Sequence, residues 1–251
     1  MTDLTNRRAL VTGSTRGIGA AVAEALAAAG ADLVLSARGT DDLTRQAAEI
    51  ADKYGVHTAT VAADLADTDE VLRLASESIA AFGGLDILVN NAGVSFPEPV
   101  TAVSVDNWNA TMDVNLRAAC LLASRVGTAM ADAGSGSIVN ISSAAGIRAL
   151  HDHYTYCISK AGLVMATQVL ALELGAEGVR ANIVCPTIVM TEMGQRVWGD
   201  EAKAAPMLAR IPAGHFAAPS DVAEAVLFLV SPAADMINGV TLPIDGGYTV
   251  T

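Results

Sequence analysis

Cysteine is scarce in this sequence, and its unbroken apolar stretches are short. The three cysteines, Cys120, Cys157 and Cys185, stand far apart and form no C-x-x-C pair. An odd number of cysteines, with no stretch that reads as a signal peptide, predicts a reduced, cytoplasmic setting. No unbroken apolar run reaches the roughly 18 residues that cross a bilayer, so we expect no membrane as a partner.

Positive charge is also in short supply. The 15 Lys and Arg residues are outnumbered by 27 Asp and Glu residues, which leaves a formal net charge of −12. Because the field of such a protein repels phosphates, we expect no nucleic acid and no anionic membrane as its main partner. A phosphate-bearing ligand must therefore be held locally, by particular cations and backbone N–H groups.

No linker or internal repeat divides the chain, so we expect one domain over residues 1–251. Short apolar runs alternate with helical stretches, and the runs lie at 9–12, 33–35, 58–63, 85–89, 137–141, 180–185 and 240–244. This alternation is typical of βαβ units, and near-continuous apolar strands suit a sheet covered on both faces. The sequence predicts a Rossmann-type α/β fold with a doubly wound parallel sheet of seven strands, whose ligands bind at the carboxyl ends of the strands.

A glycine-rich turn follows the first apolar run and reads TGSTRGIG from Thr12 to Gly19. Gly13, Gly17 and Gly19 permit a tight turn, close approach to a pyrophosphate, and close packing of helix on strand. The helix that follows adds free N–H groups and a partial positive charge. The turn therefore predicts a dinucleotide site, although glycines also occur in turns that bind nothing.

The end of the second apolar run bears on the choice between NAD(H) and NADP(H). It reads SARGT from Ser36 to Thr40 and has no acid at the strand end, where an NAD-binding fold usually places one. Arg38 can instead bind a ribose 2′-phosphate, and Arg16 of the glycine turn can reach the same group. We therefore expect NADP(H) as the preferred cofactor. NAD(H) stays open, because both arginines can also be merely solvated.

Tyr156 and Lys160 are four residues apart, so they lie on one face of a helix. Only three lysines occur in the chain, which makes this pairing less expected by chance. A tyrosine with an ordinary pKa of about 10 exchanges protons poorly at neutral pH, and a nearby ammonium lowers that pKa. The pair is a candidate for proton transfer, or else an ordinary pair on a helix surface.

The glycine turn, the N-N-A-G stretch at 90–93, Asn115, Ser143 and the Tyr156/Lys160 pair occur in the order and spacing of the short-chain dehydrogenase/reductase family, which the chain resembles. The resemblance implies an oxidoreductase that acts on CH–OH groups with NAD(P). It assigns proton donation to Tyr156, support of the tyrosine and the ribose to Lys160, the substrate oxygen to Ser143, and a water-mediated proton relay to Asn115.

The resemblance also assigns cofactor contacts along the chain. They fall on Gly13, Thr15, Arg16, Gly17, Ile18, Gly19, Arg38, Asp64, Leu65, Asn91, Ala92, Gly93, Tyr156, Lys160, Pro186, Val189 and Thr191. Asp64 would lie near the adenine, with a helix cap as the alternative. Thr191 would contact the nicotinamide carboxamide, although the usual Pro-Gly before it has become Pro-Thr here.

The segment at about 191–215 resembles the substrate loop of the dicarbonyl/L-xylulose reductase subgroup, whose members reduce α-dicarbonyls and ketopentoses. This likeness predicts a small-molecule substrate that contacts Ser143, His153 and Trp198. The alternatives are an apolar loop anchor for Trp198 and a surface role for His153. His151 and His153 have no further His/Cys cluster to complete a metal site, so we expect no metal.

Three other functions stay open: a 3-oxoacyl thioester reductase, an NAD-dependent polyol dehydrogenase, and a non-catalytic dinucleotide sensor. The first shares every motif above, but its acyl carrier partner would favour a basic surface. A sensor would have no use for a proton donor. The resemblance further implies a homo-oligomer, commonly a tetramer, for which the largely apolar helix at 163–174 is one candidate interface.

Overall fold

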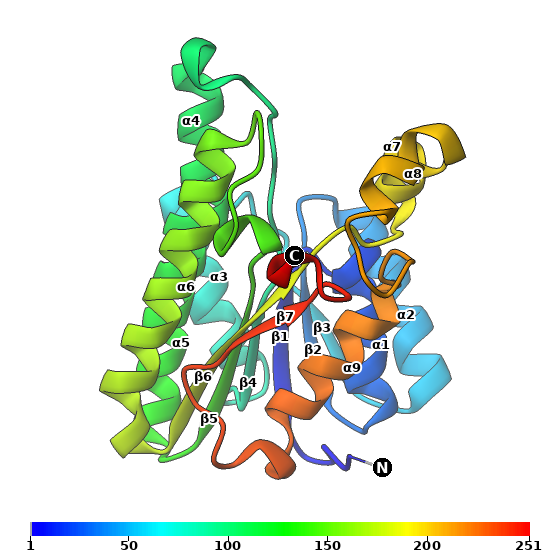
Figure 1. Ribbon diagram of the computed structural model, residues 1–251. Coiled ribbons are helices and arrows are strands. Elements are labelled where there is room, and N and C mark those ends of the chain that lie inside the picture. Colours follow the sequence, from blue (N-terminus) through cyan, green and yellow to red (C-terminus); the bar gives the residue numbers. More distant parts are fainter. Residues whose placement is uncertain (1) are drawn as a thin grey trace.

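The computed structural model describes residues 2–251, which form one parallel sheet in the order β3-β2-β1-β4-β5-β6-β7 (Figure 1). The strands are β1 (Arg8–Thr12), β2 (Asp32–Ser36), β3 (Thr58–Thr60), β4 (Ile87–Asn90), β5 (Gly136–Ile141), β6 (Val179–Pro186) and β7 (Thr241–Ile244). Every neighbouring pair is parallel. The predicted fold class and the seven strands are confirmed.

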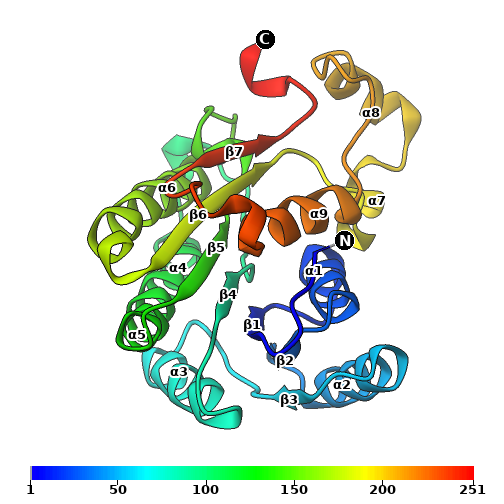
Figure 2. The ribbon, with the colours of Figure 1, turned by 90° about the horizontal axis from the view of Figure 1, so that it is seen from below.

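Helices connect successive strands and cover the sheet. They are α1 (Gly17–Ala28), α2 (Thr40–Tyr54), α3 (Thr68–Ala81), α4 (Val105–Met112), α5 (Ala119–Asp132), α6 (Tyr154–Leu174), α7 (Glu192–Trp198), α8 (Glu201–Leu208) and α9 (Pro219–Val230). A π-helical segment, Asp113–Ala118, joins α4 to α5. Viewed from below, α1, α2 and α9 lie on one side of the sheet and α3, α5 and α6 on the other (Figure 2).

Alternate residues of each strand enter opposite cores. In β1, Ala9 and Val11 pack with α1, α2 and α9, whereas Leu10 packs with α3 and α5. All three side chains are completely buried. The strands therefore read as continuous apolar runs, because both of their faces are covered.

The strand order reverses between β1 and β4. From β1 the chain adds strands toward β3, and from β4 it adds them in the opposite direction, toward β7. In sheets of this kind, ligands bind at such a switch point, outside the carboxyl ends of the strands. Figure 1 shows the same edge of the sheet lying between α4 and the α7–α8 segment. The fold thus places the predicted site residues around one edge.

Two strands, β3 and β4, differ most from the predicted runs. The run at 58–63 forms a strand only as far as Thr60, although Val61 and Ala63 still donate backbone hydrogen bonds to Leu35 and Ala37. β3 is the edge strand, so those residues have a partner on one side only. The run at 85–89 enters the sheet later, at Ile87, and ends one residue later, at Asn90.

Helix α6 bears on the expectation about membrane-spanning stretches. Among residues 2–251, the segment Tyr154–Glu177 is long and apolar enough to span a bilayer by length and composition, with a mean hydropathy of 1.4 over its best window. The mean hydropathy stays high although Ser, Thr and Lys residues interrupt the apolar run. The core helix of a globular protein meets the same criterion, and the face of α6 that carries Leu163 and Thr167 packs on the protein.

A buried polar network ties α6 to the middle of the sheet. The Asn140 side chain accepts a hydrogen bond from the Asn90 amide at 2.9 Å and donates one to Thr167 at 2.8 Å. Thr167 in turn donates to the Leu163 carbonyl. Because buried polar groups are costly without partners, these bonds fix β4, β5 and α6 relative to one another.

Candidate active site

The glycine turn joins β1 to α1 in a conformation that side chains disfavour. Gly13 and Gly17 have φ angles of 63° and 58°, which residues with a Cβ atom seldom adopt. A Cβ on Gly19 would lie 2.1 Å from the Gly13 carbonyl oxygen, so Gly19 serves packing between turn and helix. Within residues 2–251 no side chain caps the first N–H groups of α1, and this free helix terminus fits a pyrophosphate.

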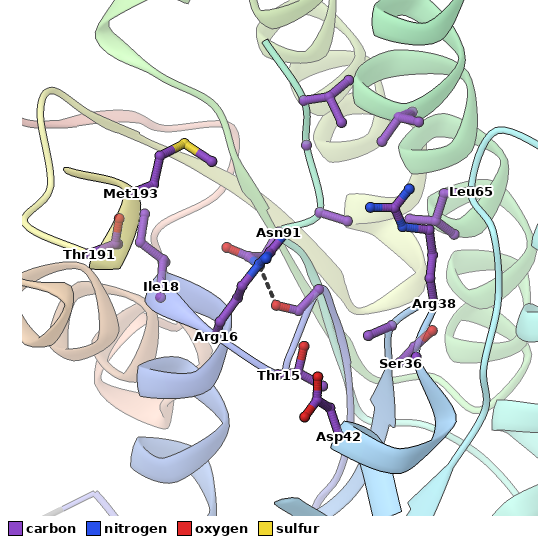
Figure 3. Close-up of a pocket in the computed structure, with 18 of the residues that line it drawn as sticks. Thr15, Arg16, Ile18, Ser36, Arg38, Asp42, Leu65, Asn91, Thr191 and Met193 are labelled. Carbon is purple, nitrogen blue, oxygen red and sulfur yellow. Dashed lines mark hydrogen bonds between the residues drawn. The ribbon is translucent and has the colours of Figure 1, made fainter. Parts of the chain in front are cut away.

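The N-N-A-G stretch after β4 is bound to that turn. The Asn91 amide donates to the Thr12 carbonyl at 2.9 Å and to the Gly13 carbonyl at 3.2 Å. Figure 3 shows the Asn91 side chain turned toward the glycine turn. The backbone N–H groups of Asn91 and Ala92 donate in return to the Thr12 hydroxyl, at 3.0 and 3.2 Å. These bonds cross the switch point and hold the two loops as one wall of a cleft.

The cleft has a volume of about 660 Å³. Most of the predicted cofactor residues line it, namely Gly13, Thr15, Arg16, Gly17, Ile18, Arg38, Asp64, Leu65, Asn91, Ala92, Gly93 and Thr191. The other predicted residues, Gly19, Tyr156, Lys160, Pro186 and Val189, do not line it. Pro186 and Val189 are buried behind the cleft, in and just after β6.

Sequence reasoning missed part of this lining. Asp42 and Arg45 reach the cleft from α2, and Glu192, Met193 and Arg196 reach it from α7. These residues lie outside every motif, so nothing in their local sequence marks them. The start of α7 also brings Thr191 and Met193 opposite Ile18 of the glycine turn (Figure 3).

Charged side chains of both signs line the cleft near β2. Arg16 lines it from the glycine turn and Arg38 from the loop after β2 (Figure 3). The Asp42 carboxylate also lines it but is paired with Arg45 at 2.8 Å. The strand end itself carries no acid, as read from the sequence. This end therefore offers guanidinium donors to an anion.

Asp64 does not cap a helix, so that alternative reading is wrong. Its carboxylate accepts a hydrogen bond from the Ala66 N–H at 3.0 Å, within a turn. The N-cap of α3 is Asp67, which accepts from the N–H groups of Asp69 and Glu70. Asp64 is left lining the cleft beside Leu65.

Asn115 and Lys160 meet beside Gly93. A Cβ on Gly93 would lie 3.2 Å from the Asn115 Oδ1 and 3.5 Å from the Lys160 Nζ, so glycine leaves room for both. Asn115 lies in the π-helical segment, accepts from the Val94 N–H at 2.8 Å and donates to the Val94 carbonyl at 2.9 Å. Lys160 is buried and donates to the Ile141 carbonyl at 2.9 Å. π-Helical turns recur at functional sites.

The pKa of Tyr156 differs from the expectation drawn from the sequence. Burial raises the pKa of the phenol above its ordinary value, and the Ser143 hydroxyl opposes this rise without cancelling it. Burial also lowers the pKa of the Lys160 ammonium to about 8. The Lys160 Nζ is 5.8 Å from the centre of the Tyr156 ring and is engaged by Ile141. The phenol therefore keeps its proton at neutral pH.

Ser143 stands where β5 leaves the sheet. Its hydroxyl accepts from the Ala145 N–H at 3.1 Å and thereby caps the short helix Ala144–Gly146. Ser142 instead donates to the Lys160 carbonyl, a bond to the backbone that tightens the contact between this loop and α6. Of the two serines, Ser143 is the one that interacts with Tyr156.

His153 precedes α6, and Trp198 is the last residue of α7. The His153 ring is 6.1 Å from the Tyr156 ring, centre to centre, and its Nδ1 is 2.7 Å from the His151 carbonyl. Because a carbonyl only accepts, Nδ1 carries a proton, which leaves Nε2 as the acceptor in the neutral ring. Trp198 packs on Phe216 at 5.9 Å and anchors the loop that carries α7 and α8. Within residues 2–251, no three His, Cys, Asp or Glu side chains gather as a metal site.

Known proteins resemble this chain over nearly its whole length. A family model described as enoyl-(acyl carrier protein) reductase matches residues 13–249. A D-threitol dehydrogenase of Mycolicibacterium smegmatis is 44% identical, over 98% of this chain and 94% of its own. An L-xylulose reductase of Mesocricetus auratus is 43% identical, over 99% and 98%. An NAD-dependent glycerol dehydrogenase of Listeria innocua is 38% identical, over 99% and 96%.

Solved structures agree with these relatives. One from Beutenbergia cavernae is described as a candidate NAD(P)-dependent gluconate 5-dehydrogenase with NADP bound at low occupancy. It superposes with a TM-score of 0.94 at 39% identity and covers 99% of both chains. The chain belongs to the short-chain dehydrogenase/reductase family and is an oxidoreductase that acts on alcohol and carbonyl groups with NAD(P).

Proposed function

We propose that the protein uses NADP(H) to reduce small α-dicarbonyls or ketoses, or to oxidise the corresponding polyols. The observation that carries this proposal is the cleft that both Arg16 and Arg38 line, with no acid at the end of β2. A guanidinium pair suits a 2′-phosphate, whereas an acid there would repel it.

The activities for which the relatives are named support the substrate class. A D-threitol dehydrogenase and an L-xylulose reductase are among them, and both names denote small polyhydroxylated substrates. His153 suits such molecules, because its Nε2 can accept a hydrogen bond from a hydroxyl near Tyr156. The acidic surface argues against an acyl carrier, so a thioester reductase is less well supported.

Each group in the cleft then has a task in holding the cofactor. The glycine turn and the N-terminus of α1 bind the pyrophosphate, and Arg16 and Arg38 bind the 2′-phosphate. Asp64 and Leu65 flank the adenine, and Thr191 contacts the carboxamide. When bound, the nicotinamide supplies or accepts the hydride. Trp198 holds the substrate loop in place through Phe216.

Proton transfer falls to residues of this chain. Tyr156 donates its phenolic proton to the carbonyl oxygen, and burial keeps that proton in place until the oxygen accumulates charge. Ser143 donates a hydrogen bond to the same oxygen and polarises it. The Lys160 ammonium favours the phenolate that is left, and Asn115 supports the path that returns a proton from solvent. Oxidation of an alcohol follows the same path in reverse.

A second candidate is NAD-linked polyol oxidation. Asp42 lines the cleft and could accept a hydrogen bond from a ribose hydroxyl if released from Arg45. The glycerol dehydrogenase among the relatives is named as NAD-dependent. This alternative differs from the proposal in its cofactor.

Helix α6 supplies a candidate surface for the homotetramer that we also propose. Its outer face exposes Met165 and Leu172, at 58% and 82% of their surfaces. An exposed apolar stripe of this kind favours burial against a second copy. Light scattering on the purified protein should give four times the mass of the chain, and a monomer would refute the assembly.

Initial rates should separate the two candidate functions. We expect fast NADPH oxidation with diacetyl and with L-xylulose, and slower oxidation of NADH, because only NADPH has the phosphate that the arginines bind. An acetoacetyl thioester serves as the control substrate. Activity confined to the thioester would refute the substrate class, and a preference for NADH would favour NAD-linked polyol oxidation.

Replacing Tyr156 by Phe should abolish turnover and leave cofactor binding intact. The substitution removes the proton donor but keeps the ring, and loss of general acid catalysis costs at least about a hundredfold in rate. Steady-state rates and NADPH fluorescence titration measure the two properties separately. Tyr154→Phe is the matched control, because that ring is exposed and packs near Trp108. Normal turnover in Tyr156→Phe would remove Tyr156 from the mechanism.

Cofactor affinity should fall as the pH rises through about 8, where the Lys160 ammonium loses its proton. Below that pH the side chain is charged and can donate to the ribose, and above it the charge is gone. The dissociation constant of NADPH between about pH 6.5 and 9.5 tests this, since the raised pKa of Tyr156 lies above that window. Lys160→Met should bind more weakly with no such inflection. An inflection unchanged in that variant would contradict the assignment.

A further inference from the structure

Ser14 of the glycine turn is held from three directions. Its N–H donates to the Ser36 carbonyl at the end of β2, at 3.1 Å. Its hydroxyl donates to the Gln46 Oε1 at 3.1 Å, and its carbonyl accepts from the Gln46 Nε2 at 2.6 Å. Ser14 is completely buried, and Gln46 is 9% exposed. A single side chain of α2 thus satisfies both the hydroxyl and the carbonyl of Ser14.

This junction joins the two elements that carry the arginines of the cleft. Ser14 stands two residues before Arg16, and Ser36 stands two residues before Arg38. Gln46 lies on the second turn of α2, one residue after Arg45, and α2 begins at Thr40. A shift between the glycine turn and α2 would therefore change the separation of Arg16 and Arg38.

Gln46 and Ser14 do not themselves line the cleft. A bound nucleotide therefore meets the arginines, and the buried pair acts only through them. Without Gln46, the Ser14 carbonyl and hydroxyl would be buried unpaired, which favours a shifted turn that restores their hydrogen bonds. Adenosine contacts from other loops, such as those of Asp64 and Leu65, would be affected less.

We propose that Gln46 is a positioning residue for recognition of the 2′-phosphate, because its paired hydrogen bonds to Ser14 hold the glycine turn that carries Arg16 against the β2–α2 segment that carries Arg38. The inference rests on the proposed use of NADP(H). Bidentate and paired guanidinium contacts depend on geometry, so a small change in spacing weakens the phosphate contact selectively.

Binding of two nucleotides that differ by the 2′-phosphate tests the inference without turnover. Calorimetry measures the dissociation constants of adenosine 2′,5′-bisphosphate and 5′-AMP for the wild type, Gln46→Met and Ser14→Ala. Methionine keeps the length of the side chain but neither donates nor accepts well. Gln168→Met, an exposed glutamine on α6, is the matched control.

The wild type should prefer the bisphosphate, and Gln46→Met should reduce that preference about five- to tenfold, as loss of a well-placed hydrogen bond would. Ser14→Ala should reduce it less, because its carbonyl still accepts from Gln46. In the double variant the reductions should not add, since both act on one junction. Gln168→Met should leave the preference unchanged.

Two results would overturn different claims. A wild type with no preference for the bisphosphate would refute the proposed use of NADP(H), whatever the variants do. A wild-type preference that survives in Gln46→Met would refute the positioning role alone. Equal weakening of both nucleotides in Gln46→Met would also refute it, because that result indicates general damage to the turn; thermal unfolding of each variant reports such damage independently.

Discussion

The pairing of the glycine turn with the N-N-A-G stretch is the interaction on which the site depends. Thr12 and Asn91 exchange hydrogen bonds across the point where the strand order reverses. Because β1 and β4 are neighbours only in the folded sheet, this contact joins chain segments about eighty residues apart. It leaves the N-terminus of α1 facing the cleft and sets Gly93 beside Asn115 and Lys160.

Burial sets the electrostatics of the catalytic groups. Burial raises the pKa of the Tyr156 phenol and lowers that of the Lys160 ammonium, so each is pushed toward its neutral form. A neutral phenol is the form that donates a proton, so this arrangement suits carbonyl reduction. The sequence alone suggested the opposite direction for the phenol, since spacing reveals a neighbouring charge and not the depth at which both groups lie.

The cleft is lined by arginines and by an acid, Asp42, that is paired with another arginine. Arg16 and Arg38 provide guanidinium groups, and Arg45 pairs with Asp42, an acid that lines the cleft from α2. Gln46, next to Arg45 on the same helix, ties α2 to the glycine turn. On the proposals above, cofactor choice would depend on where α2 sits as well as on the residue at the end of β2.

The sequence by itself determined the order of elements, the doubly wound sheet, and most of the residues that line the cleft. These depend on local patterns: apolar runs that end in Gly13 or Asn90, and the four-residue spacing of Tyr156 and Lys160. Strand limits were not determined in this way, because the end of β3 depends on its place at the edge of the sheet.

Only the tertiary structure decided which segments, remote in the chain, lie next to one another. It brought Asp42 and Met193 to the cleft, whereas Val189 is buried and does not line it. It made Asp67, and not Asp64, the N-cap of α3. It also decided the direction of the pKa shifts. The physical reason is that burial and long-range hydrogen bonds depend on how helices pack on the sheet, which no local pattern encodes.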